Sequence, residues 1–256
     1  EHMGRVKRSE RENIDVLPNA HIGLSTLTFL FEGSIMHCDT LGNKVEIKPG
    51  AVNWMTAGKG IVHSERTPEY LRHSDKNMHG LQIWVALPKE LEQMDPEFFH
   101  IVQEEIPTWK NGDLQFKLIA GEAFGKRSPV PVYSKLFMIE IKSTTSQVLN
   151  IGDRLYGESG LYILEGSIES DGNIYHSKQL LVAKESSLCQ FTIQANSTIY
   201  IFGGEPFPEE RFIDWNFVSS RKELIEEAKQ KWKAQAFDKI KGDEIEFIPY
   251  PSQTKK

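Results

Sequence analysis

The sequence predicts an all-β protein of two similar β-barrels in tandem, followed by one α-helix. Runs of β-branched and aromatic residues alternate with turn signals at intervals of about eight to twelve residues, which is typical of antiparallel sandwiches and barrels. The segment LFEGSI at 30–35 recurs as ILEGSI at 163–168, and a turn containing Gly-Asn follows each copy. A repeat of this kind favours two copies of one architecture.

The expected domains are 1–125 and 126–256, because the Gly/Pro/Ser-rich stretch 121–131 is typical of a linker or a long functional loop. In the first half, residues 5–17 are expected to form a loop with a short strand, residues 66–78 a loop, and residues 89–99 one or two exposed helical turns. Strands are expected at 24–31, 34–38, 44–47, 51–55, 60–65, 78–88 and 114–120. A second β-rich half begins near residue 132.

The tail has a different pattern. Residues 221–236 place Leu224, Ala228 and Trp232 at helical spacing, and Ser219 or Ser220 is a candidate N-cap with Glu223 as its reciprocal partner. This predicts one amphipathic helix at about 220–236, packed on the second barrel, and a polar tail from residue 243.

Composition excludes several classes of function. The chain has 30 basic and 36 acidic residues and a net charge of −6, so we expect no direct binding of nucleic acid, which requires a clustered basic face. No apolar run is long enough for a membrane span, and no secretory signal is visible. The two cysteines, Cys38 and Cys189, form no disulfide framework and favour a reducing cytoplasm. The abrupt start at Glu1 is consistent with a cloning remnant or with the middle of a longer protein.

The strongest candidate site is the stretch 56–65, which ends in His63 and Glu65. Residues i and i+2 of a strand point to the same side, so the two side chains are expected to face one cavity. His21 lies at the start of the first long strand, and Asn19 comes two residues before it. Two imidazoles and one carboxylate form a set typical of non-haem iron, to which Asn19 could add an amide oxygen.

The other histidines are expected to be ordinary polar groups with hydrogen-bond partners. They are His37, His73, His79, His100 and His176. Of these, His79 is the one most compatible with a position next to the candidate metal ligands. His2 is compatible with a tag.

The stretch 18–88 closely resembles the pirin family, a branch of the two-barrel cupins. The segments that carry the resemblance are 23–33, 37–43, 49–65 and 79–88, with WMTAGKGIVHSE at 54–65 the most specific and weaker likeness at 203–206 and 215–220. It therefore covers most of the chain. Pirins usually have a longer N-terminus with a stretch like His2-Met3-Gly4 inside it, which favours a native fragment over a cloning remnant.

The resemblance implies two cupin (jelly-roll) barrels with one metal ion, usually Fe(II) or another divalent transition metal, in the first. The family's ligands are three histidines and one glutamate, and His21, His63 and Glu65 match three of them. Asn19 stands where the family has its first histidine. A lost imidazole should weaken metal binding, since even loss of a group that only orients a ligand costs about ten- to hundredfold in affinity.

The internal repeat predicts that the second barrel holds no metal. Asn19 and His21 precede Gly33 by 14 and 12 residues, and the same offsets from Gly166 fall on Gly152 and Arg154. Neither is a metal ligand. We expect this barrel to be structural, the alternative being an anion site at Arg154.

Three functions remain open at this stage. The resemblance implies a metal-dependent dioxygenase of the quercetin 2,3-dioxygenase type, with a flavonol-like substrate and Glu65 as ligand and catalytic base. It equally implies a non-enzymatic regulator that binds a protein partner. A third possibility is a degenerate site that binds a small molecule or nothing. A cytoplasmic monomer is expected in each case.

Overall fold

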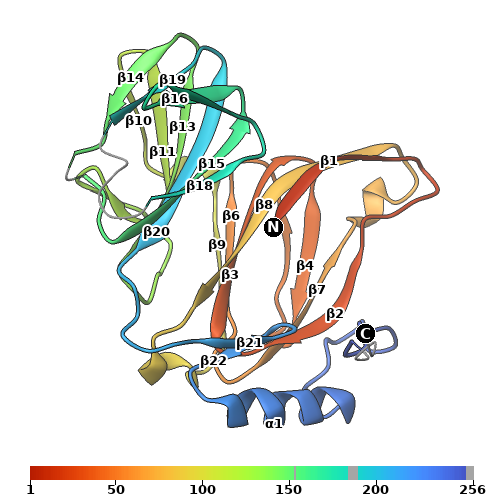
Figure 1. The fold of residues 1–256 in the computed structure, drawn as a ribbon. Coiled ribbons are helices and arrows are strands. Elements are labelled where there is room, and N and C mark those ends of the chain that lie inside the picture. The colour runs from red at the N-terminus through yellow and green to blue at the C-terminus, as the bar shows by residue number, and fades with distance from the viewer. Residues whose placement is uncertain (153, 184–189, 252–256) are drawn as a thin grey trace, which may run out of the picture. The chain divides into compact units, whose positions relative to one another are not determined.

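The computed structural model describes residues 1–152, 154–183 and 190–251, so Cys189 and the end of the predicted tail lie outside it. The chain forms two compact units (Figure 1). The first contains Glu1–Gln103 together with the chain from Pro208 onward, and the second is Glu104–Phe207. This division differs from the expected domains 1–125 and 126–256, because the chain returns to the first unit after residue 207.

The first unit is an all-β barrel completed by the C-terminal segment. Its strands are β1 (His2–Arg8), β2 (Val16–His21), β3 (Leu24–Glu32), β4 (Ile35–Asp39), β5 (Lys44–Ile47), β6 (Val52–Thr56), β7 (Ile61–Arg66), β8 (Lys76–Ala86), β9 (Glu97–Ile101), β21 (Phe212–Asp214) and β22 (Phe217–Ser219). The 3₁₀ turns η1 (Glu69–Leu71) and η2 (Lys89–Leu91) and the helix α1 (Lys222–Lys233) complete it. The expected strands are confirmed. The helical turns expected at 89–99 are limited to η2, because Phe98 and its neighbours pair with β6.

Two antiparallel sheets make up this barrel. One has the order β1-β8-β3-β6-β9 and the other β2-β7-β4-β5, while β21 and β22 form a separate hairpin. In the second sheet, β7 lies between β2 and β4, so that His63 is opposite Asn19 on one side and Asp39 on the other. Glu65 is opposite His37. The register therefore gathers polar side chains of three strands at one level of the barrel.

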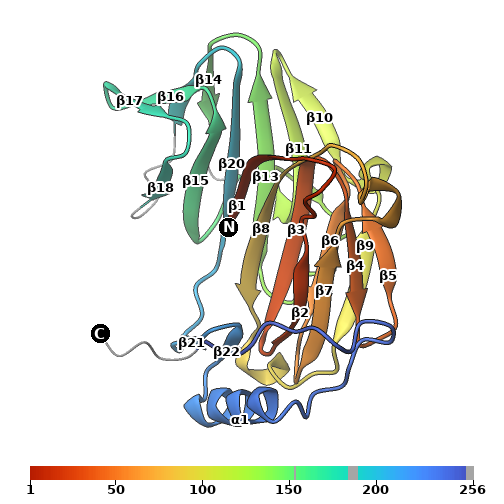
Figure 2. The same ribbon diagram turned by 90° about the vertical axis from the view of Figure 1, so that its right-hand side faces the viewer.

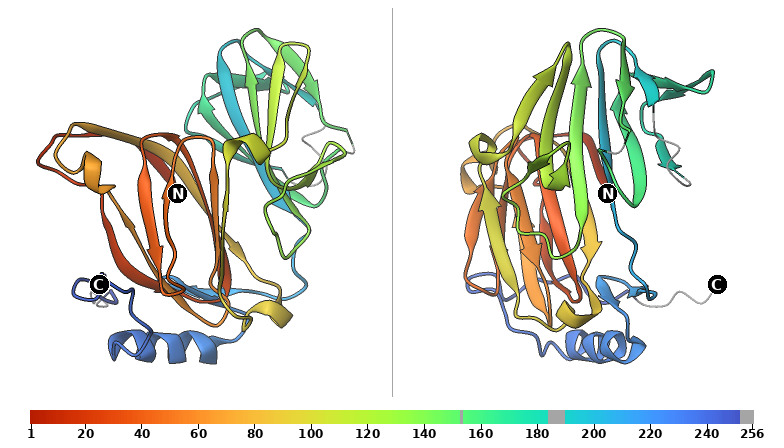
Figure 3. Two further views of the ribbon diagram at one scale, coloured as in Figure 1. Left: turned by 180° about the vertical axis from the view of Figure 1, so that it is seen from behind. Right: turned by 90° about the vertical axis from the view of Figure 1, so that its left-hand side faces the viewer.

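The second unit is also all β (Figure 3). Its strands are β10 (Thr108–Asn111), β11 (Leu114–Ala123), β12 (Lys126–Arg127), β13 (Leu136–Ser143), β14 (Gln147–Asn150), β15 (Glu158–Glu165), β16 (Ser167–Ser170), β17 (Asn173–His176), β18 (Leu180–Ala183), β19 (Gln190–Ile193) and β20 (Ser197–Gly204), with the turn η3 (Gln103–Glu105) at its start. Buried apolar residues form its core, among them Phe116, Ile139, Phe191 and Ile201. Apolar side chains therefore fill the interior of this barrel.

The repeated Glu-Gly segment occupies the same place in both barrels. Gly33 follows β3 and Gly166 follows β15, with positive φ values of 85° and 76° that favour glycine. A Cβ on Gly33 would lie 2.1 Å from the carbonyl oxygen of Asn77, and one on Gly166 would lie 2.1 Å from Oγ of Ser197. Both glycines thus permit a sharp exit from a long strand into the next hairpin, which explains why the sequence repeats here.

Helix α1 packs on the first barrel, so its expected position on the second barrel is wrong. Figures 1 and 2 show it beside β21 and β22. Its buried residues Ile225, Ala228 and Trp232 form one cluster with Ala20 and Val62, the outward side chains of β2 and β7. Those two strands leave an apolar surface that the amphipathic face of α1 covers, and this decides where the helix docks.

The predicted capping box is also wrong. Arg221 is the N-cap and makes no capping hydrogen bond through its side chain. The hydroxyls of Ser219 and Ser220 instead donate to the carboxylate of Glu92, at 2.7 and 3.1 Å, and Arg211 forms an ion pair with it at 3.0 Å. Glu92 is 2% exposed, so a buried charge that needs partners competes successfully for the serines. The start of the helix is thereby bound to the end of η2.

A second ion pair binds the C-terminal segment to β7. Arg66 donates to both carboxylate oxygens of Asp243, at 3.0 and 2.6 Å, and Ser64 donates to one of them at 2.8 Å. Burial alone would raise the pKa of Asp243, but the hydrogen bonds from Arg66 and Ser64 lower it below its ordinary value of 3.8. The outward face of β7 is therefore covered by a charge-assisted contact as well as by apolar packing.

None of the helices in the described ranges is long and apolar enough to cross a membrane.

We expect Arg66→Gln to lower the free energy of unfolding by about 1–3 kcal/mol, because Asp243, whose side chain is only 19% exposed, would lose its main partner. Urea unfolding measures this. Arg127→Gln is the matched control, since its ion pair with Glu122 is exposed and should contribute less than about 1 kcal/mol. Equal effects of the two substitutions would contradict the importance of the Arg66 contact.

Candidate functional site

Strand β7 presents His63 and Glu65 to the inside of the first barrel, as their spacing predicts. Both are buried, with 3% and 7% exposure, while the residues between and beside them point to the C-terminal segment. Gly58 and Gly60, which precede the strand, have φ values of 50° and 146°. A Cβ on Gly58 would lie 2.1 Å from the carbonyl oxygen of Met94, so glycine permits the close backbone approach that starts β7.

His21 and His63 meet inside the barrel. Their Nε2 atoms lie 3.1 Å apart, and the two rings are 4.9 Å apart at an angle of 65°. The ring of Trp84 stands edge-on to His21 at 5.3 Å. The Nδ1 atoms of both histidines are buried without a hydrogen-bond partner among the described residues. The two Nε2 atoms are hydrogen-bonded to each other, one donating and the other accepting, and no other group among the described residues fixes which ring donates.

Asn19 lies opposite His63, but its amide group is bonded elsewhere. Its nitrogen donates to the main-chain oxygens of Leu17 and His63, at 3.0 and 3.3 Å. Its oxygen accepts a hydrogen bond of 2.9 Å from Asn216, in the turn between β21 and β22. The oxygen that the sequence offered as a ligand is therefore a partner of the C-terminal segment.

Glu65 is bound from the opposite sheet. Nε2 of Gln82 on β8 donates to Oε1 of Glu65 at 3.0 Å, and Thr28 on β3 lies at 3.5 Å from the same oxygen. Gln82 also donates to Thr28 at 3.2 Å, so the three side chains form one small network. Sequence reasoning missed Gln82 and Thr28, because their approach depends on the packing of two sheets and has no signal of its own in the sequence.

Sequence reasoning also missed the role of His37 and Asp39. His37 was expected to be an ordinary polar side chain, and it does have a partner, since its Nε2 lies 3.0 Å from Oδ2 of Asp39. Both are almost fully buried, and the His37 ring is 5.4 Å from that of His63. The i, i+2 spacing places both residues on the inner face of β4, but the predicted strand ended at residue 38, so Asp39 was assigned to the following turn.

The electrostatics follow from burial. Burial lowers the pKa of His21 to about 3. It also holds the pKa of His63 well below its ordinary value of 6.5, with further lowering by His21 and His37. Burial raises the pKa of Glu65, although His37, Thr28 and Gln82 act in the opposite direction. The histidines are thus neutral at pH 7, the form in which imidazole binds metals.

These residues fit a metal ion in part. Two imidazole ligands at about 2.1 Å from one metal ion and at right angles to each other have nitrogens about 3 Å apart, which matches the His21–His63 separation. Glu65 and Asn19 are bonded to other groups. Within the described residues, no three His, Cys, Asp or Glu side chains are arranged so that together they could hold a metal ion. The geometry therefore supplies two converging donors, with the carboxylate of Glu65 on the same strand.

The remaining histidines lie outside this arrangement of contacts. Nε2 of His79 is 2.8 Å from that of His2, and its ring is 4.8 Å from Phe31. Nδ1 of His100 is 2.7 Å from the side-chain oxygen of Asn53. His73 and His176 are exposed.

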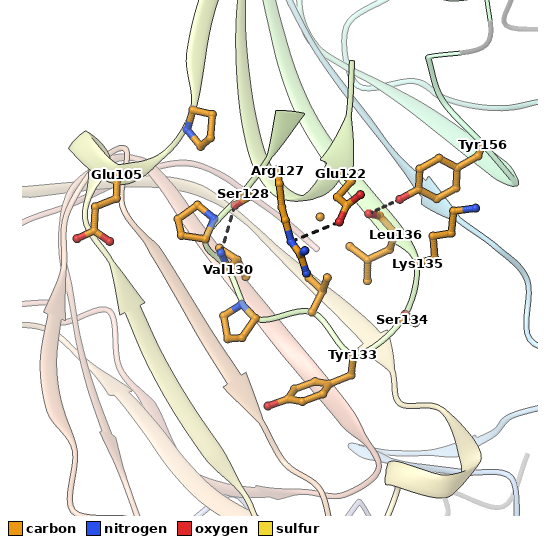
Figure 4. Close-up of a pocket in the computed structure, with 15 residues that line it drawn as sticks. Glu105, Glu122, Arg127, Ser128, Val130, Tyr133, Ser134, Lys135, Leu136 and Tyr156 are labelled. Carbon is orange, nitrogen blue, oxygen red and sulfur yellow. Dashed lines mark hydrogen bonds and ion pairs between the residues drawn. The ribbon is translucent and has the colours of Figure 1, made fainter. Parts of the chain in front are cut away.

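In the second unit, the guanidinium of exposed Arg154 lies 5.6 Å from the ring of Phe124, and Gly152 is exposed. The predicted linker or functional loop at 121–131 lines a cavity of about 1020 Å³ together with Tyr133, Lys135 and Tyr156 (Figure 4). Three of the charged residues that line this cavity are paired, Arg127 with Glu122 at 3.3 Å and Lys135 with Glu205. The cavity therefore offers no free charge to a ligand through these four groups.

Two antiparallel barrels in one chain, the first with inward-facing histidines, define a protein of the two-barrel cupin class. A crystal structure of quercetin 2,3-dioxygenase from Acinetobacter baumannii has a TM-score of 0.88 and 31% identity, covering 100% of this chain and 84% of that one. A bacterial pirin from Escherichia coli in complex with nickel(II) has a TM-score of 0.58 at 18% identity, over 79% of this chain and 81% of that one, a likeness of fold.

Sequence comparison gives the family. Residues 1–85 match the Pirin family and residues 139–238 match the Pirin C-terminal cupin domain. A pirin-like protein of Caulobacter vibrioides is 47% identical over 243 residues, which are 94% of this chain and 83% of the relative. The chain therefore belongs to the pirin family, and the predicted family and fold class are confirmed.

The buried histidines predict a specific dependence of stability on pH in metal-free protein. The pKa of His21 is about 3 in the folded state against about 6.5 when unfolded, so its contribution to stability is fully present above pH 6.5 and is lost as pH falls towards 3. The slope for one such group reaches about 1.4 kcal/mol per pH unit. His63 acts in the same direction, whereas the raised pKa of Glu65 favours the folded state as pH falls.

Urea unfolding between pH 7 and 4.5 with a chelator present tests this. His21→Phe should make the dependence on pH shallower, while His73→Phe, at an exposed position, should leave it unchanged. Parallel curves for His21→Phe and the unmodified protein would contradict the assignment of a neutral, buried His21.

Proposed function

We propose that the first barrel binds a divalent transition metal ion, iron or another, through His21 and His63 with Glu65 beside them, and that the protein is an oxygenase of the quercetin 2,3-dioxygenase type. The observation that carries the proposal is the approach of the two Nε2 atoms to 3.1 Å. It is supported by the likeness to the Acinetobacter baumannii quercetin 2,3-dioxygenase over the whole chain. The substrate class would be a flavonol-like aromatic compound.

In this proposal Glu65 is the catalytic base. A bound metal ion would act as a Lewis acid that favours the ionised form of a phenolic substrate. The carboxylate of Glu65 would take the proton from the substrate hydroxyl, and the raised pKa of this buried group makes it a better proton acceptor than an exposed glutamate. Gln82 donates to Oε1 of Glu65 and would orient the carboxylate, leaving Oε2 for the proton.

A second candidate is a binding or regulatory protein without catalytic activity. The observation in its favour is the hydrogen bond from Asn216 to the amide oxygen of Asn19, the residue at the position where the resemblance implies a histidine ligand. With two imidazoles in place of three, the affinity for metal would be lower, and the barrel would act by binding a small molecule or a protein partner. Metal content and reactivity separate the two candidates.

The test of the proposed function starts from protein purified without chelators. We expect close to one equivalent of a divalent transition metal, and a shift of the flavonol absorption band when quercetin is added without oxygen. Admission of oxygen should then cause oxygen uptake. Less than about a tenth of an equivalent of metal, with no shift and no uptake after loading with iron, would refute the oxygenase and favour the second candidate.

Restoring the missing imidazole should strengthen the site. We expect Asn19→His to tighten binding of Co(II) or Ni(II) by at least about tenfold, because it adds a third imidazole opposite His63. Isothermal titration measures the affinity. Asn19→Gln is the control, since it keeps an amide and should not tighten binding. If Asn19→His leaves the affinity unchanged, position 19 does not face the metal, or another group takes its place.

A further inference from the structure

We propose that His37 is a positioning residue of the first barrel, which keeps the ring of His63 in the orientation that brings its Nε2 to His21. The proposal rests on the proposed function for its consequence, metal binding, but its geometric part concerns the metal-free protein as well. It assigns a role to a histidine that is neither a predicted ligand nor a partner of the substrate.

The first step is that Asp39 is fixed. Its Oδ1 accepts hydrogen bonds from the main-chain nitrogens of Leu41 and Asn43, at 2.9 and 3.1 Å, and the Asn43 side chain donates to both of its oxygens. Asp39 is 1% exposed at the end of β4. A carboxylate bonded by the turn that follows it cannot change rotamer without breaking that turn.

The second step is that Asp39 and Phe98 fix His37. Nε2 of His37 lies 3.0 Å from Oδ2 of Asp39. Its ring stacks on that of Phe98 in β9, with centroids 4.3 Å apart and planes at 12°. The hydrogen bond comes from the same strand and the stacking from the opposite sheet, so two independent contacts determine where the ring lies.

The third step is that His37 limits the movement of His63. The His63 ring is 4.9 Å from that of His21 and 5.4 Å from that of His37. The Nε2 atom of His63 is hydrogen-bonded to that of His21, while its Nδ1 has no partner among the described residues, so packing by His37 is what holds the other side of the ring. Across the ladder between β4 and β7, His37 is opposite Glu65 and Asp39 is opposite His63. His37 and Asp39 therefore lie next to both site residues of β7.

The physical consequence is that the volume of the His37 ring keeps His63 in place. Without that ring, His63 gains space to turn away from His21, and the two Nε2 atoms lose the separation that suits one metal ion. An aromatic ring of similar size at position 37 should restore the packing. A phenyl ring has no nitrogen that could bind a metal ion or form a hydrogen bond. Recovery with phenylalanine therefore distinguishes positioning by packing from direct ligation and from an effect of the imidazole nitrogens.

The experiment compares His37→Ala, His37→Phe and the control His176→Ala, which lies at an exposed position in the second unit. In metal-free protein, ¹H–¹⁵N spectra of the imidazole nitrogens report the environment of His21 and His63. We expect their signals to change in His37→Ala and to return close to their original positions in His37→Phe. Titration with Co(II), followed by its visible absorption and by calorimetry, should show affinity lowered about ten- to hundredfold in His37→Ala and largely recovered in His37→Phe.

Each result of this experiment either supports or overturns the positioning role of His37. Unchanged imidazole signals in His37→Ala would overturn the proposal whether or not the protein binds metal. Signals and affinity that stay altered in His37→Phe would also overturn it, because the nitrogens of His37 would then be needed. A lower melting temperature of His37→Ala, with unchanged affinity of the folded protein, would indicate a merely structural role. Absence of Co(II) binding in the unmodified protein, with the expected imidazole signals, would refute the proposed function and leave the positioning role supported.

Discussion

The alternation of side chains along β7 determines both what the first barrel encloses and what covers it. His63 and Glu65 point inward, while Val62, Ser64 and Arg66 meet the C-terminal segment. A shift of one residue in the register of this strand would exchange the two sets and bury Arg66 in place of Glu65. The contacts of Ser64 and Arg66 with Asp243 therefore stabilise the site, although none of these atoms touches it.

Asn19, which stands where the resemblance to the pirin family implies a histidine, is hydrogen-bonded through all of its amide group. An amide can accept from Asn216 and donate to two main-chain oxygens at the same time, which a neutral imidazole with one donor cannot do. Asn19 thus links β2 to the hairpin of β21 and β22. In this chain position 19 serves the packing of the C-terminal segment, and in the proposed metal site the imidazole ligands would be His21 and His63.

Much of the fold and half of the site could be predicted from the sequence. Strand periodicity gave the barrels, and the spacing of His63 and Glu65 gave their common direction. His37 was missed because a single histidine in a strand has no mark that distinguishes a structural from a functional place, and Asp39 because the predicted strand ended one residue before it. Asn216 was missed because it is 197 residues from its partner, and the serines before α1 were misassigned because the buried charge of Glu92 outweighs local capping preferences.

The return of the chain to its first unit has a consequence for folding. Residues 1–103 are synthesised before the whole second unit, but the apolar surface formed by Ala20 and Val62 is covered only by residues after 207. During synthesis this surface stays exposed while more than a hundred residues follow, a condition under which partly folded chains aggregate. The second unit, continuous in sequence, has all of its own core residues within reach and can form first. In this family member, the barrel that is made first is completed last.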